Sequence, residues 1–180
     1  MGRHRARWIG ITVLVIAAGL IAVLAGRPSA SVAEVQSPLV GHPAPAITGT
    51  TLDGTGLSLP TAPGHFVVLN FFASWCAPCQ QEGPDLVAFQ FEHQQAGDAS
   101  MVSVVFGDTL SAARSYQKTL GVSWPTLTDS NGKLALAYGV SDRPTTFVIA
   151  PDGRVTAYIV GAVTVKGLDR VIAAAKATHA

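Results

Sequence analysis

Residues 66–79 read FVVLNFFASWCAPC, and this stretch predicts both the fold and the chemistry of the chain. Its first half, Phe66–Phe72, is a near-continuous apolar run, which is typical of a strand buried on both faces in the middle of a sheet. Its second half contains the only two cysteines among 180 residues, Cys76 and Cys79, where a helix is predicted to begin. The stretch therefore predicts a buried strand that delivers a cysteine pair to a helix N-terminus.

The spacing and placement of the two cysteines favour redox chemistry. Sulfurs three residues apart on a helix can join with little movement of the backbone. The unpaired N–H groups and the dipole of a helix N-terminus stabilise a thiolate on Cys76, and the thiolate is the reactive form. Pro78 suits the first helical turn, where a missing N–H costs nothing. We expect Cys79, which lies further along the helix, to attack a mixed disulfide and release the substrate.

Other uses of a cysteine pair fit the sequence less well. A zinc site needs about four ligands, but a second cysteine pair is absent and the five histidines show no paired spacing. Haem attachment needs a histidine after the second cysteine, where position 80 is Gln. A structural disulfide remains possible, although so small a loop constrains the chain little. We therefore predict redox chemistry with no metal and no cofactor.

The remaining patterns predict an α/β fold. Strand and helix signals alternate along the first part of the chain, and an antiparallel hairpin and a helix follow. This order favours a mixed central sheet with helices on both faces. The predicted elements are a hairpin within 47–59, a helix over 76–95 kinked at Pro84, a strand over 101–106, helices over 110–120 and 133–138, strands over 145–150 and 155–160, and a helix over 167–177.

The N-terminus predicts export of the folded part. Residues 1–7 are basic, and an uncharged apolar stretch follows that is close to the roughly 20 residues needed to span a bilayer. Basic residues before this stretch favour a cytoplasmic N-terminus. We expect a cytoplasmic segment over 1–7, a single-pass anchor or uncleaved signal over 8–26, a linker over 27–39 and one domain over 40–180. Cleavage of a signal peptide near Ala33, with secretion, is the alternative.

The distribution of charge argues against nucleic-acid binding. From Glu34 onward the chain carries eight basic and eleven acidic residues, a net charge of −3. Nucleic-acid binders instead present a basic face or stripe. No nucleic-acid partner is expected.

Several motifs together resemble membrane-anchored thioredoxin-like proteins of the TlpA, ResA and DsbE (CcmG) type. They are VVLNFFASWCAPC at 67–79, QEGP at 81–84, YGV at 138–140, RPTTF at 143–147, DG at 152–153, VG at 40–41, AP at 44–45 and LDG at 52–54. The resemblance implies a thioredoxin-like fold with an N-terminal β-hairpin extension. It also implies that Pro144 is a cis proline facing the cysteines, with the backbone of Arg143 and Thr145 beside Cys76 to pair with an extended substrate.

The resemblance also implies roles for residues around the cysteines. Asn70 stands where cytoplasmic thioredoxins carry a buried Asp, so the proton route through that Asp is missing. Glu82 is the candidate substitute, because it follows Cys79 by three residues and shares its helical face. A raised pKa would let it exchange a proton with Cys79, although it could merely complement the helix dipole.

Five further residues are candidate substrate contacts. We expect Trp75 to pack beside the site and shield it, with ordinary core packing as the alternative. Arg143 could stabilise the Cys76 thiolate or could be a solvated surface residue. The full candidate set for substrate contact is Trp75, Ala77, Pro78, Arg143 and Thr145.

The direction of the reaction is predicted from what surrounds the thiols. A strong oxidant stabilises its reduced thiolate, often with a cation between the cysteines, whereas here Ala and Pro stand there. We expect a reductase that keeps apocytochrome c or another exported thiol protein reduced, with electrons from a membrane thiol carrier. An oxidant of secreted proteins is one alternative. A copper-delivery protein is another, although its sites usually space cysteines CxxxC and add a distant histidine.

Overall fold

A computed structural model describes residues 37–60 and 62–179, the pair 33–34 and the single positions 8, 16 and 19. The chain divides into two units between Ser31 and Val32, and the elements below belong to the second. The anchor predicted over 8–26 lies outside the described residues except at those three positions. In the part of the chain that is described, no helix has the length and apolar character needed to cross a membrane.

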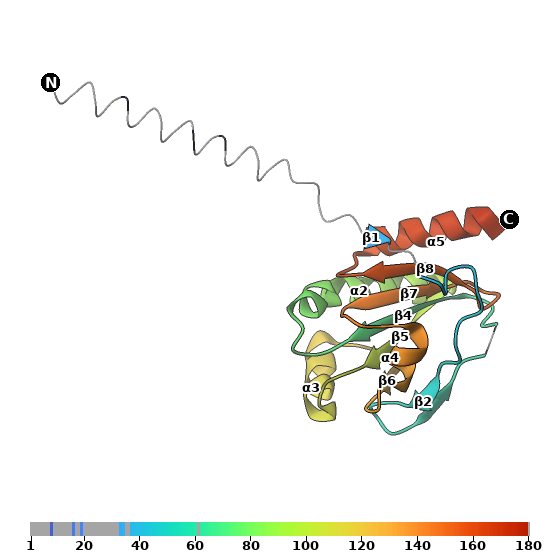
Figure 1. The fold of residues 1–180 in the computed structure, drawn as a ribbon, viewed down its shortest axis with the longest axis horizontal. Coiled ribbons are helices and arrows are strands. Elements are labelled where there is room, and N and C mark those ends of the chain that lie inside the picture. Colours follow the sequence, from blue (N-terminus) through green and yellow to red (C-terminus); the bar gives the residue numbers. More distant parts are fainter. Residues whose placement is uncertain are drawn as a thin grey trace. The chain divides into compact units, whose positions relative to one another are not determined.

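The described strands of this unit form a central mixed sheet and a separate hairpin (Figure 1). The sheet strands are Ala33–Glu34 (β1), Phe66–Phe72 (β4), Ala99–Val105 (β5), Thr126–Thr128 (β6), Thr145–Ile149 (β7) and Val155–Val160 (β8). Their order across the sheet is β1-β8-β7-β4-β5-β6. Pairing is parallel from β4 through β5 to β6 and antiparallel from β4 through β7 and β8 to β1. The predicted mixed sheet is confirmed.

The central strand β4 is buried along its whole length. Successive side chains of a strand point to opposite faces of the sheet. Accordingly, Val68 packs in one core cluster with Phe89, whereas Leu69 packs in a second cluster with Tyr138. Burial on both faces is the physical reason for the continuous apolar run, and the prediction for this strand is confirmed.

Helices cover both faces of the sheet, as predicted. The described helices of this unit are Ala77–Ala96 (α2), Leu110–Leu120 (α3), Lys133–Tyr138 (α4) and Val165–His179 (α5). Helices α2 and α5 supply side chains to the cluster around Val68, and α4 supplies them to the cluster around Leu69. Pro84 lies inside α2, and the helix continues across it over 20 residues.

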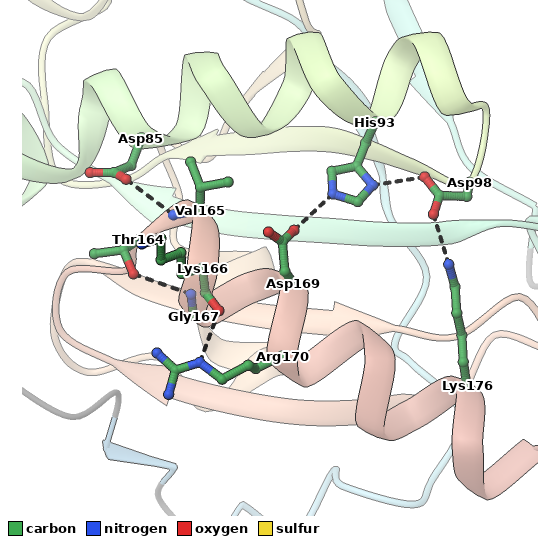
Figure 2. Close-up of polar contacts among 10 residues, drawn as sticks. All are labelled: Asp85, His93, Asp98, Thr164, Val165, Lys166, Gly167, Asp169, Arg170 and Lys176. Atoms are coloured by element: carbon green, nitrogen blue, oxygen red, sulfur yellow. Dashed lines mark hydrogen bonds and ion pairs between the residues drawn. The ribbon is translucent and has the colours of Figure 1, made fainter.

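Figure 2 shows polar contacts that join α2 and the turn after it to α5. The Nδ1 atom of His93 lies 2.7 Å from Asp98, and its Nε2 atom lies 3.0 Å from Asp169 on α5. Lys176 on α5 donates to the other oxygen of Asp98 at 2.7 Å. Despite the cost of burial, these carboxylates raise the pKa of His93. The cluster therefore ties the two helices together when His93 is protonated.

The separate hairpin consists of Thr48–Thr50 (β2) and Gly56–Ser58 (β3), which pair antiparallel as predicted. Leu52 donates its amide to the carbonyl of Thr126, which attaches the hairpin region to β6. Strands β6 and β1 are not predictable from the sequence, because two or three residues carry too little periodicity to be recognised. Strand β1 lies inside the segment interpreted as a linker.

Candidate active site

The cysteine pair lies at the start of α2 and forms a disulfide. The Cα atoms of Cys76 and Cys79 are 5.2 Å apart. Cys76 is the N-cap residue, and its Sγ accepts a hydrogen bond from the amide of Cys79 at 3.2 Å. Cys76 and Cys79 are both buried, at 5% and 2% exposure. A thiolate on Cys76 would receive the same amide hydrogen bond, which stabilises that form.

The loop before β7 faces this sulfur. The Arg143–Pro144 peptide bond is cis, as the resemblance implied. The carbonyl oxygen of Arg143 lies 3.6 Å from the Sγ of Cys76. In the oxidised protein this carbonyl oxygen only contacts the sulfur. In the reduced protein it could accept a hydrogen bond from the Cys76 thiol. Pro144 is buried, and its carbonyl accepts from the amide of Gly161. The sequence-predicted cysteines and proline therefore meet at one place.

Glu82 is buried behind the cysteines, with 1% of its surface exposed. One carboxylate oxygen accepts from the side-chain amide of Asn70 at 2.9 Å, and the other accepts from the amide of Val163 at 2.9 Å. Burial raises the pKa of Glu82 from 4.5 to about 7, against the lowering effect of these two hydrogen bonds. Glu82 and Cys79 line the same small pocket. A carboxyl group that titrates near neutrality therefore lies beside the second cysteine.

Asn70 takes a structural part in this network. Its amide nitrogen donates both to Glu82 and to the hydroxyl of Thr146 at 3.0 Å. Asn70 cannot replace a proton-accepting Asp, and Glu82 is the predicted substitute. The geometry connects the two side chains directly.

Trp75 and Arg143 form the rim beside Cys76. Trp75 is 61% exposed, so it is not an ordinary core residue. Its indole nitrogen donates to the carbonyl of Gly107 at 3.1 Å. The guanidinium carbon of Arg143 lies 5.1 Å from the ring centre of Trp75 and 4.4 Å from that of Phe106. Arg143 is thus a half-buried, stacked residue and not a freely solvated one.

The other predicted contact residues differ in their accessibility. Ala77 and Pro78 are exposed on the first turn of α2, where a substrate could touch them. Thr145 is fully buried in β7, and its hydroxyl donates to the carbonyl of Asp142 at 2.8 Å. The side chain of Thr145 therefore orders the loop before Pro144 and does not face solvent.

Sequence reasoning missed the loop that follows β5. Asp108 in this loop accepts a hydrogen bond from the amide of Ser74 at 2.7 Å, and Phe106 and Gly107 contact Arg143 and Trp75. Parallel neighbours end at the same sheet edge, so the pairing of β4 with β5 brings this loop to the cysteines. The available signal was the Gly107-Asp108 pair directly after a predicted buried strand.

The histidines do not build a metal site in the described part of the chain. No group of three or more potential ligand side chains is found there. His93 has carboxylates on both ring nitrogens. The side-chain surroundings of His179 lie outside the described residues.

A dithiol pair at a helix N-terminus, facing a cis proline loop on this mixed sheet, defines a thioredoxin-like thiol–disulfide oxidoreductase. The chain belongs to the AhpC/TSA family, whose model matches residues 40–158. It is 34% identical over 143 residues to the thiol-disulfide oxidoreductase ResA of Bacillus subtilis, covering 79% of this chain and 75% of the relative. The resemblance to oxidoreductases of the ResA and DsbE type is thereby confirmed.

Solved structures support the same assignment. A thiol:disulfide interchange protein of the thioredoxin family from Chlorobium tepidum shares 31% identity and a TM-score of 0.65, covering 77% of this chain and 97% of that one. A secreted thiol-disulfide isomerase from Corynebacterium glutamicum shares 29% identity and a TM-score of 0.66, covering 71% and 81% of the two chains.

Proposed function

We propose that this oxidoreductase works as a reductase on the extracytoplasmic side of the membrane, with residues 8–26 as its anchor and 40–180 as its catalytic domain. The cysteines act as the catalytic pair, and Glu82 and Pro144 assist them. Its substrate is an exported protein, of which apocytochrome c is the leading candidate, and a membrane thiol carrier reduces it again. The apolar N-terminal stretch and a solved relative that is secreted support this location.

The observation that carries the proposed direction is the buried carboxyl group of Glu82 in the pocket shared with Cys79. A carboxylate near the dithiol disfavours a thiolate there, and a less stable reduced form is a stronger reductant. The residues between the cysteines are Ala and Pro, which contribute no cation.

The proposed reaction conserves atoms and electrons. The Cys76 thiolate attacks one sulfur of a substrate disulfide, which forms a mixed disulfide and releases the other substrate sulfur as a thiolate. Cys79 passes its proton to Glu82 and attacks the Sγ of Cys76. The Cys76–Cys79 bond forms, and the second substrate sulfur leaves as a thiolate. Protons from Glu82 and water neutralise the two products, so the substrate gains two electrons and the protein loses two.

The reduction potential of the full chain in non-ionic detergent tests this direction. The protein is equilibrated with thiol redox buffers, and the oxidised fraction is measured by alkylation of free thiols. A potential near about −270 mV, the range of thioredoxin, supports the reductase. A potential between about −120 and −180 mV contradicts it and favours an oxidant or isomerase of secreted proteins.

A further inference from the structure

The guanidinium of Arg143 is held between two aromatic side chains and, among the described residues, has no charged partner. It lies between the rings of Trp75 and Phe106, with its central carbon 5.1 and 4.4 Å from their centres. The Trp75 ring is itself held by its hydrogen bond to Gly107. A Cβ atom added to Gly107 would lie 3.1 Å from the Nη2 atom of Arg143, so glycine leaves room for this arrangement. The stack therefore orients the planar cation.

Within the described part of the chain, no side-chain hydrogen bond of this cation is found. An arginine carries five N–H donors. Among the described residues, no carboxylate lies within 4.0 Å of the Arg143 guanidinium, and its buried Nε has no hydrogen-bond partner. The neighbouring carboxylates have other donors. Asp108 accepts from the amides of Ser74 and Thr109, and Asp142 accepts from the backbone amide of Arg143.

The position of this residue connects it to the reacting sulfur. The carbonyl oxygen of Arg143 is 3.6 Å from the Sγ of Cys76, so one residue contacts the sulfur with its backbone and directs a cation toward the exposed indole of Trp75. Pre-oriented groups lose less conformational entropy when a ligand binds. The planar guanidinium of arginine can also donate two parallel hydrogen bonds to one carboxylate, which the ammonium group of lysine cannot do as well.

We propose that Arg143 determines specificity by binding a carboxylate next to the reacting cysteine of a protein substrate. The preferred substrate class is therefore an exported protein with an Asp or Glu beside its disulfide. This inference rests on the proposed thiol–disulfide exchange and adds to it a choice of substrate. Trp75 and Phe106 act as positioning residues for the cation.

Two matched peptides test the proposal. Both contain one disulfide, and they differ only by Glu or Gln beside the reacting cysteine. The full chain is reduced in non-ionic detergent, freed of reductant and mixed with each peptide, and its oxidation is followed by tryptophan fluorescence. We expect the Glu peptide to react about threefold to tenfold faster, as a half-buried charge pair allows. Added salt should reduce this ratio, because it screens an exposed pair.

Substitutions of Arg143 test whether this residue causes the preference for the Glu peptide. We expect Arg143→Gln to bring the ratio of the two rates close to one and Arg143→Lys to retain part of it. The control is Arg170→Gln, which removes an exposed arginine from α5 and should keep the wild-type ratio.

The outcomes separate the inference from the proposed function. Equal rates with the two peptides in the wild type, or an unchanged ratio in Arg143→Gln, overturn the inference and leave the exchange reaction intact. The inference is also overturned if Arg143→Gln slows both peptides equally and shifts the pKa of the Cys76 thiol, measured by thiolate absorbance. Failure of the wild type to react with either peptide refutes the proposed function and the inference with it.

Discussion

Replacing Glu82 by Gln should make the oxidised protein more stable at alkaline pH while slowing its turnover. Burial raises the pKa of Glu82 from 4.5 to about 7, so the folded protein holds this proton more tightly than the unfolded chain does. The stabilising effect of the neutral group is complete below pH 4.5 and is lost as the pH rises through about 7. Gln stays neutral throughout, so it avoids this loss.

The size of the effect follows from the same two pKa values. A rise from 4.5 to about 7 corresponds to about 3 kcal/mol of free energy of unfolding, since one pKa unit is about 1.4 kcal/mol. This free energy is not reduced for screening by solvent, because Glu82 is only 1% exposed. Glu82 meets two N–H donors, from Asn70 and Val163. Turning over the Asn70 amide would present an oxygen to the NH₂ group of Gln, so the variant can retain its hydrogen bonds.

Urea unfolding of the oxidised full chain in non-ionic detergent, from about pH 4.5 to 8.5, measures this effect. The difference in unfolding free energy between Glu82→Gln and wild type should increase by about 3 kcal/mol over that range. Other titrating groups cancel in the difference. Substrate reduction by the same variant should be slower by about tenfold or more, because Cys79 loses its proton acceptor. A stability difference that does not change with pH would falsify the assignment of a neutral, buried Glu82.

Three further changes test other parts of the structure. Cys79→Ala should accumulate mixed disulfides on Cys76, visible on non-reducing gels, and normal turnover of this variant would contradict the mechanism. His93→Gln should lower the free energy of unfolding by about 1–2 kcal/mol near pH 5.5, because the protonated ring of His93 bonds two carboxylates. The loss should be smaller above the raised pKa of His93, and an equal loss at both pH values in urea unfolding would refute this. Gly83→Ala places a Cβ 2.7 Å from the Tyr116 hydroxyl and should cost about 1–3 kcal/mol in urea unfolding, whereas the control Gly56→Ala meets no atom within 4 Å.

The sequence predicts best those elements whose residues share one strong pattern. The run of apolar residues in β4 identifies a central strand because burial on both faces leaves no place for polar side chains. The three residues of β6 and the two of β1 offer no such pattern. Their pairing depends on strands distant in sequence, and only the folded sheet reveals it.

The candidate site is likewise predictable from the sequence only in part. The cysteine spacing predicts the pair that forms the disulfide, and helical spacing predicts that Glu82 lies on the face of Cys79. The surroundings of Arg143 are not predictable in this way, because Phe106 comes from a loop 37 positions earlier in the chain. Sequence reasoning therefore could not distinguish a stacked arginine from a solvated one.

The segment before the hairpin has a protective consequence for the sheet. Strand β8 would otherwise be an edge with unpaired N–H and C=O groups, which can recruit a strand from another molecule. Ala33 and Glu34 pair with its end, and the amide of Gly41 and the carbonyl of His42 bond Val155 at its start. Residues 33–34 and 41–42 thus cover the two ends of this edge, which leaves less of it open to intermolecular β-pairing.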